Sequence, residues 1–518
     1  MKKLVSLLLA LCLLALPVLG MAEASTEQQP TPAVHRQDYD HSGVNTKKPY
    51  TVLMYLVGDR NQDMDAVLVE INKILEAEYN TTLDIQFLSW SDYQTLYPLL
   101  LSGGEKVDLI YTASWCYLYS EAAKGSFYVM DEDFIKKNMP MTYANQVAES
   151  WGTVTIGEGI QGVPCNMMVA QYKFPGIRWD LAEKHGITEV PDSWEDWMNY
   201  ALTIAEKETP VSGIYALSSA ADNIEVWRTY YEQFNAMPVY NDDFLVAYPE
   251  DGVLPEAEEI KWAMSTEWFR SFAHDMKKLA DAGAWSRSAL TNTIANYQAF
   301  GNGTGASTFW NGTIFNYMRQ VEKTAEGITC VPCDLSPDAR VFCEEYNNSV
   351  MAIAANSENP ERAALVMDLL GYDYELNLLS LLGVEGVHWT EAEGGRYYSS
   401  DDASNGYQDN TNALGWWCKK DYKLGTVNDQ QQEAYNVVLR SRMTSNPCVT
   451  FVFDESPVKP YVAAINNIRS EYFGILTLGL VDDVDATLAE MNQKLEESGI
   501  QKVYEEFYRQ YNEWKASR

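Results

Sequence analysis

The hydrophobic and polar positions after Tyr50 switch repeatedly between strand-like and helix-like patterns. Residues 50–57 form an apolar, β-rich run, and residues 83–87 alternate apolar and polar side chains at period two. A helical stretch lies between them, with one apolar stripe at Val67, Ile71, Ile74 and Leu75. A second helical stretch ends at the glycines 103–104, and residues 107–111 form another short strand. This β-α-β-α-β order predicts an α/β fold with a parallel sheet covered by helices.

Ligands of such sheets bind in the crevice outside the carboxyl ends of the strands. The loops predicted at that edge are residues 58–61 (GDRN), 89–91 (SWS) and 113–115 (ASW). Two of these loops carry a tryptophan, and all three carry short polar groups. We therefore expect a ligand site at this edge.

The later part of the chain is mostly helical in pattern. Ser193 is a good N-cap, followed by acidic residues in the first turn of a helix, and Pro360 stands at the first position of another helix. Residues 488–495 and 500–514 form two amphipathic helices separated by a Ser-Gly break.

The first 48 residues differ in pattern from the rest. Lys2 and Lys3 precede an apolar run over residues 4–19, which is shorter than the ~20 residues that a membrane-spanning helix needs. Small residues at Ala22 and Ala24 then provide the spacing that signal peptidase reads. We predict a secretory signal over residues 1–24 and a flexible leader over residues 25–48, and hence an exported protein.

Composition narrows the class of protein. The 518 residues include 15 Trp, 33 Tyr and 16 Phe, enough to build sizeable cores, and the length suggests two or three domains at roughly 100–200 residues each. There are 73 acidic and 38 basic residues, giving a formal charge of −35. That charge disfavours binding to nucleic acid or to anionic membranes.

The sequence offers no convincing catalytic, metal or cofactor site. The motifs of serine hydrolases, zinc proteases, phosphate-binding loops and dinucleotide folds are absent, and with 73 acids a carboxylate pair can arise by chance. Asp59, Asn61, Asp63 and Glu70 match calcium-loop positions, but Met64 occupies the position that requires glycine, so helix capping explains them better. Cys330 and Cys333 are expected to form a local disulfide or to be buried. We predict neither an enzyme nor a bound metal or cofactor.

Tryptophans beside polar or glycine-rich sequence are the stronger signal. Sugars present flat apolar faces ringed by hydroxyls, so their binding proteins use aromatic platforms together with polar rims. Residues 309–312 (FWNG) supply both within four positions. The alternative is that a given tryptophan is buried in the core. This alternative is weakest for Trp115 and Trp310, because both adjoin predicted loops.

Several stretches together resemble the extracellular solute-binding proteins of bacterial ABC importers. They resemble the large sugar-type branch of this family, which carries an extra C-terminal domain of unknown function. The matching stretches are residues 107–115, 162–166, 179–187, 191–196, 347–361, 383–389, 454–458 and 504–514. The resemblance extends over residues 48–518.

This resemblance implies a two-lobed, periplasmic-binding-protein-like fold that closes on its ligand as a hinged trap, with helical C-terminal additions. The N-terminal lobe is expected to hold residues 48–163 plus about 305–360. The C-terminal lobe is expected to hold residues 164–304 plus about 361–518, including the extra domain, with the hinge near Pro164.

The same resemblance implies a function. The chain is expected to bind a carbohydrate, in particular an oligosaccharide, and to deliver it as a monomer to an ABC permease at the extracellular face of the membrane or in the periplasm. Tryptophans would stack on the sugar, and polar side chains would bind its hydroxyls. The residues expected to line the cleft are Asp59, Trp115, Asn166, Trp227, Trp310, Asn311, Asn348 and Trp417.

Three alternatives remain open from the sequence. The ligand could be a peptide or another polar solute. The chain could instead be a secreted carbohydrate-cleaving enzyme, or a sensor domain that presents its ligand to a receptor.

Overall fold

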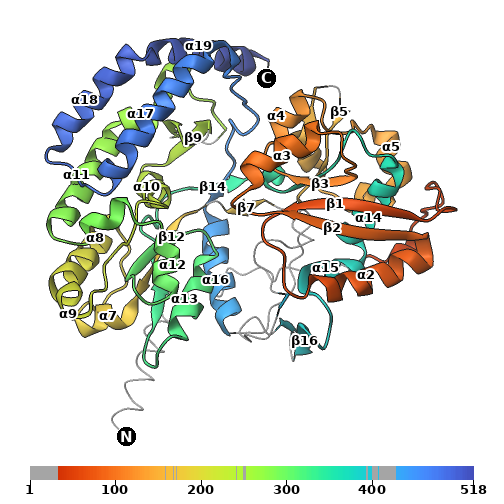
Figure 1. Cartoon of the computed structure of the whole chain (residues 1–518), viewed down its shortest axis with the longest axis horizontal. Helices are drawn as coiled ribbons and strands as arrows, with labels where there is room; N and C mark the ends of the chain where they lie inside the picture. Colours follow the sequence, from red (N-terminus) through yellow and green to blue (C-terminus); the bar gives the residue numbers. More distant parts are fainter. Residues whose placement is uncertain are drawn as a thin grey trace, which may run out of the picture.

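Two hydrophobic cores divide the chain into two lobes, which lie side by side in Figure 1. The computed structural model describes residues 33–517, except for residues 158, 167, 171, 241, 249–251, 393–394, 399–405 and 408–426. The predicted secretory signal and Trp417 lie outside the described residues.

Lobe 1 is built on the predicted parallel sheet. Its strand order is β2–β1–β3–β15–β6. β1 and β2 run parallel over their full length, from Tyr50 opposite Thr81 to Val57 opposite Leu88. β15 runs antiparallel to both β3 and β6. The strands are β1 (Tyr50–Val57), β2 (Thr81–Leu88), β3 (Leu109–Thr112), β6 (Val163–Pro164) and β15 (Val350–Ile353).

Helices cover this sheet because each buries one apolar stripe. In α2 the buried side chains include Val67, Ile71 and Leu75, as the sequence pattern predicts. The lobe 1 helices are α2 (Met64–Tyr79), α3 (Tyr93–Ser102), α4 (Leu118–Ala123), α5 (Glu132–Asn138), α6 (Pro140–Asn145), α14 (Pro360–Tyr372) and α15 (Tyr374–Leu382).

Lobe 2 has two small sheets. In one sheet, β8 lies between β12 and β13 and runs antiparallel to both. The other has the order β11–β10–β9. The strands are β8 (Phe174–Arg178), β9 (Ala236–Tyr240), β10 (Phe244–Ala247), β11 (Lys261–Trp262), β12 (Ser307–Trp310) and β13 (Cys330–Pro332).

The helices of lobe 2 include the C-terminal α17–α19, whose apolar faces belong to the same core as the rest of the lobe (Figure 1). The lobe 2 helices are α7 (Trp179–Lys184), α8 (Trp194–Thr203), α9 (Thr209–Ser212), α10 (Asn223–Glu232), α11 (Glu267–Asp281), α12 (Asn296–Gly301), α13 (Ile314–Glu322), α16 (Val427–Ser441), α17 (Lys459–Thr477), α18 (Val484–Glu497) and α19 (Ile500–Ala516).

The chain passes between the lobes through a small sheet of order β18–β14–β7. β7 (Val169–Ala170) and β14 (Val341–Glu344) pair antiparallel, and β18 (Met443–Thr444) pairs parallel with β14. Figure 1 shows β7 and β14 between the two lobes. The first crossing follows Pro164 directly, at the position where the sequence places the hinge.

The segments assigned to each lobe differ from the sequence prediction in two places. Residues 307–332 belong to lobe 2, because β12 and β13 both pair with β8. Residues 360–382 belong to lobe 1, because α14 and the first part of α15 contribute buried side chains to its core. Local periodicity carries no information on which sheet or core a helix or strand joins.

The prediction of a flexible leader is wrong for residues 33–48. Arg36 is buried and its Nη1 lies 2.9 Å from Asp373 Oδ1, while Nη2 lies 2.6 Å from Glu78 Oε1. His41 Nε2 lies 3.0 Å from Asp368 Oδ2. A polar segment without periodicity is therefore fixed on lobe 1 by ion pairs and hydrogen bonds to distant residues.

Cys330 and Cys333 are free thiols. Of the two sequence expectations, burial is the correct one: Cys333 is fully buried and Cys330 partly so. Burial raises the pKa of both thiols, which suppresses the reactive thiolate.

Candidate ligand-binding site

Three loops of lobe 1 meet at one edge of its sheet. β1 and β2 end side by side, and the Gly58 amide donates to the Leu88 carbonyl at 2.7 Å. β3 runs parallel to β1, so residues 58–63, 89–92 and 113–117 all emerge at the carboxyl edge. This placement confirms the sequence prediction for these loops.

The same edge faces the connections to lobe 2. Val350, the first residue of β15, pairs with both Thr112 and Pro164, the last residues of β3 and β6. The segments that cross between the lobes, residues 165–173 and 345–349, therefore leave lobe 1 from its carboxyl edge. Loops at this edge border the space between the lobes.

Trp115 is an exposed indole that is held firmly in place. Its side chain is 42% exposed. Nε1 donates to the Asn348 backbone carbonyl at 3.0 Å and to Asn348 Oδ1 at 3.3 Å. The ring also contacts three aromatic neighbours, with centroid distances of 6.1 Å to Trp90, 6.0 Å to Tyr111 and 6.4 Å to Tyr93. An apolar face is thus offered to solvent with little rotamer freedom left to lose on binding.

The crossing segments support this loop from behind. The Ser114 amide donates to the Asn347 carbonyl at 2.8 Å, and Asn347 Nδ2 donates to the Tyr119 hydroxyl at 2.6 Å. Asn347 is fully buried. The sequence reasoning missed this residue, although the Asn347-Asn348 pair was visible in the resemblance.

Lobe 2 presents Trp310 and Asn311 toward the crossing. Trp310 ends β12 opposite Phe174, which begins β8 directly after the crossing segment. It is half-buried, with its ring 5.2 Å from that of Tyr297. Asn311 is exposed, and its Oδ1 accepts from the Thr313 amide at 3.0 Å, which sets the turn into α13.

Two further predicted site residues, Asp59 and Asn166, lie on different segments of the chain. Asp59 is exposed in the loop after β1, and Asn166 is half-buried in the first crossing segment. The neighbouring Cys165 amide donates to the Ser349 carbonyl at 2.7 Å, so Asn166 and Asn348 lie on adjacent segments. Trp417 lies outside the described residues.

The prediction that Trp227 lines the cleft is wrong. Its side chain is 1% exposed within the core of lobe 2. The ring packs edge-on against Phe269 and Tyr231, with centroid distances of 5.1 and 5.3 Å. The physical reason is that Trp227 lies on the apolar face of the amphipathic helix α10.

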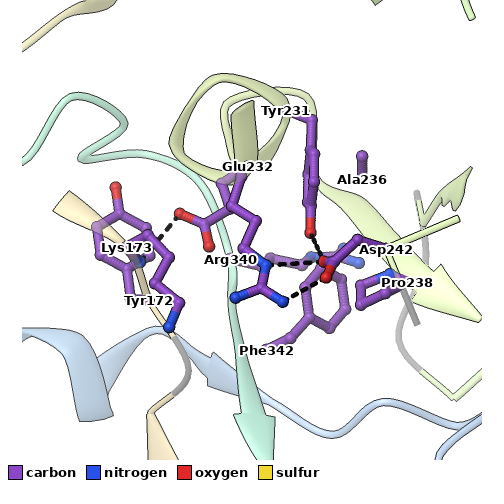
Figure 2. Close-up of a pocket in the computed structure, with 10 residues that line it drawn as sticks. Tyr172, Lys173, Tyr231, Glu232, Ala236, Pro238, Asp242, Arg340 and Phe342 are labelled. Carbon is purple, nitrogen blue, oxygen red and sulfur yellow. Dashed lines mark hydrogen bonds and ion pairs between the residues drawn. The ribbon is translucent and has the colours of Figure 1, made fainter. Parts of the chain in front are cut away.

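A charged cavity beside the crossing segments was not predicted. It has a volume of about 30 Å³ and is lined by Tyr172, Lys173, Arg228, Tyr231, Glu232, Ala236, Pro238, Asp242, Arg340 and Phe342. Figure 2 shows Glu232 near Lys173 on one side and Tyr231 facing Asp242 on the other. No short sequence motif predicts this cavity, because its charged residues come from separate segments of the chain.

Arg228 and Asp242 form an ion pair in this cavity. Arg228 Nε donates to Asp242 Oδ1 at 2.8 Å, and the Tyr231 hydroxyl donates to the same oxygen at 3.0 Å. Burial raises the pKa of Glu232 well above its ordinary value. The volume holds about one water molecule and is too small for a sugar, so the cavity is a structural feature of the lobe next to the crossing.

Asp63, one of the residues that match calcium-loop positions, contacts other protein groups. The Asp63 amide donates to the Gly406 carbonyl at 3.0 Å, and Asp63 Oδ2 lies 3.4 Å from His388 Nε2. Within the described ranges no group of three or more His, Cys, Asp or Glu side chains is arranged to hold a metal ion. Nor does any helix in those ranges combine the length and apolarity needed to cross a membrane.

Residues 57–371 match the family of bacterial extracellular solute-binding proteins. The chain belongs to this family. Residues 447–516 of this solute-binding protein match a domain of unknown function, DUF3502. Family membership confirms the prediction of a solute-binding protein rather than an enzyme.

Similar proteins extend over nearly the whole chain. A carbohydrate ABC transporter substrate-binding protein of Streptococcus pneumoniae serotype 4 is 24% identical over 478 residues, which are 89% of this chain and 90% of the relative. The N-glycan transport solute binding protein NgtS from Streptococcus pneumoniae has a TM-score of 0.70 at 22% identity, covering 90% of this chain and 98% of NgtS. The alginate-binding protein AlgQ2 has a TM-score of 0.66 at 17% identity, covering 91% and 100%. These structures confirm the two-lobed fold.

Proposed function

We propose that this solute-binding protein is the substrate-binding component of an ABC importer and binds an oligosaccharide between its two lobes. The observation that carries the proposal is Trp115, an exposed indole braced by three aromatic rings and by Asn348 at the edge that borders the interlobe space. The relatives support it, because one is described as a carbohydrate transporter component and NgtS as an N-glycan transport protein.

The lobes supply complementary contacts in this proposal. Trp115 stacks on a sugar face from lobe 1, and Trp310 with Asn311 contacts the same ligand from lobe 2. Asp59 and Asn166 contribute hydrogen-bond partners for hydroxyls, while Asn348 holds the Trp115 ring.

Closure follows from this division of contacts. Ligand stabilises the closed form because only that form offers contacts from both lobes at once. The crossing strands β7 and β14 are short and absorb the change in angle. A membrane permease then recognises the closed monomer, and no bond in the ligand is made or broken.

The deciding experiment is a binding screen of the chain from residue 25 against mono- and oligosaccharides and peptides, by thermal shift and then calorimetry. A ligand at 100 times its Kd adds ~2.7 kcal/mol to the free energy of unfolding. We expect an oligosaccharide to give a saturable shift.

Trp115→Ala then tests the site. We expect it to weaken binding of that oligosaccharide by about 2 kcal/mol, or roughly thirtyfold in Kd. Trp514→Ala, the same change on the C-terminal helix α19, is the matched control and should leave Kd within about twofold. Binding of peptides alone, or hydrolysis of the sugar, would contradict the proposal.

A further inference from the structure

The fold alone leaves the charge of the ligand open, and the described groups that border the interlobe space bear on it. We infer that the ligand is an uncharged oligosaccharide, and that oligosaccharides carrying carboxylate groups are rejected. This inference rests on the proposed function and adds the chemical class of the sugar.

The edge loops of lobe 1 are acidic. Residues 58–63, 89–92 and 113–117 contain three carboxylates, Asp59, Asp63 and Asp92, and one basic residue, Arg60. Asp59 and Asp92 are exposed. Asp92 lies two residues after Trp90, whose ring contacts that of Trp115, and the Ser89 hydroxyl donates to Asp92 Oδ2 at 2.7 Å. Asp92 therefore belongs to the same loop as the proposed stacking platform.

Arg60 is turned away from this edge. Its Nη1 donates to the Ile85 carbonyl at 3.0 Å, three residues before β2 ends, and its Nη2 bonds to Asp65 Oδ1. The guanidinium therefore lies alongside β2, before its carboxyl end, and is already engaged by the Ile85 carbonyl and Asp65. It also lies over the Phe87 ring, 5.6 Å from the centroid.

The crossing segments add no available cation within the described residues. Lys173 is the basic residue of the first segment, where it is buried with Nζ 3.3 Å from Glu225 Oε2. The second segment carries one charged residue, Glu345, and burial raises the pKa of this carboxyl. On lobe 2, Trp310 is followed by uncharged residues 311–313.

A carboxylate that enters a partly dehydrated gap needs a guanidinium, an ammonium or several N–H donors to replace its water. The described edges offer such a ligand aromatic, amide and hydroxyl groups together with exposed carboxylates. These groups suit neutral hydroxyls and repel anions, and the formal charge of −35 acts in the same direction.

The test compares an uncharged hexose oligosaccharide found to bind with an oligouronate of the same length, by calorimetry at 20 mM and 500 mM NaCl. We expect the oligouronate to bind at least roughly tenfold more weakly than the uncharged oligosaccharide at low salt. Part of this difference in affinity should be lost at high salt, because salt screens the repulsion between exposed charges. Equal or tighter binding of the oligouronate would overturn the inference while leaving the proposed function intact. If no carbohydrate of either kind binds, both fail.

A matched pair of variants locates the effect. Asp92→Lys changes the charge by two, two residues from Trp90, and Asp482→Lys makes the same change in the exposed turn before α18, within residues 447–516. We expect Asp92→Lys to strengthen oligouronate binding severalfold at low salt and Asp482→Lys to leave it nearly unchanged. Equal effects of the two variants would contradict a local origin.

Discussion

Two tryptophans that the sequence analysis assigned to the binding cleft differ sharply in side-chain exposure. Trp115 follows a strand end and is 42% exposed, whereas Trp227 lies inside a helix and is 1% exposed. Both stand beside polar residues in the sequence, so local polarity does not separate them. The helical spacing of Val226, Trp227, Tyr230 and Tyr231, which are all buried, was the signal that assigns Trp227 to the core.

A substitution of Trp227 should therefore affect stability and not binding. We expect Trp227→Ala to lower the free energy of unfolding by about 3–5 kcal/mol, because it leaves a large cavity among packed rings. Urea unfolding followed by circular dichroism measures this loss. Calorimetry on the folded variant should give a ligand Kd within about twofold of the parent. A tenfold loss of affinity at unchanged stability would instead show that Trp227 belongs to the ligand-binding site.

At the scale of elements, the turn after α17 depends on one glycine. Gly479 has φ +58°, and a Cβ at this position would stand 2.3 Å from the Lys277 backbone nitrogen and 2.4 Å from its Cα, on α11. Backbone atoms inside a packed helix pair cannot give way without separating the helices. The close approach of this turn to α11 therefore requires glycine.

We expect Gly479→Ala to destabilise the protein by about 3–5 kcal/mol, since it combines backbone strain with a steric clash. Gly327→Ala is the matched control. Gly327 has φ +88°, but nothing lies within 4 Å of its added Cβ, so we expect a cost of about 1–2 kcal/mol from the left-handed conformation alone. Thermal and urea unfolding compare the two, and equal losses would show that the contact with Lys277 does not matter.

Secondary elements were the most predictable part of the chain. The alternation of period-two and helical patterns gave β1, α2, β2, α3 and β3 of lobe 1 in their correct order. The predicted N-cap at Ser193 is formed, with its side chain accepting from the Asp196 amide, and Pro360 begins α14 as predicted. Residues 33–48 were not predictable in this way. Their order depends on Glu78, Asp368 and Asp373, which are far away in the sequence.

At the scale of the whole molecule, the C-terminal unit of residues 447–516 is an integral part of lobe 2. The rings of Phe244 and Phe507 stack at a centroid distance of 4.2 Å. Trp285 Nε1 donates to the Leu478 carbonyl at 2.8 Å, and the Trp262 amide donates to the Tyr504 hydroxyl at the same distance. Side chains from both parts form one continuous core.

Removing this unit should therefore unfold the lobe it covers. We expect a chain that ends at residue 446 to lose cooperative thermal unfolding of lobe 2 and all ligand binding, because the apolar faces of α11 and β10 become exposed to water. Near-ultraviolet circular dichroism and calorimetry measure both effects. A truncated chain that melts cooperatively in full and still binds its ligand would show that the unit is separable.

The sequence by itself determined the first three strands and first two helices of lobe 1, the last two helices of the chain, and the three loops that gather at the carboxyl edge of the first sheet. Periodicity and strand direction are local properties, so a single segment carries them. Only the tertiary structure decided that β12 and β13 join lobe 2, that α14 joins lobe 1, that Trp227 is buried, and that Trp115 is held by Asn348. Those outcomes depend on contacts between residues that are distant in sequence, where many pairings satisfy the same local pattern and the packing of the whole core selects one.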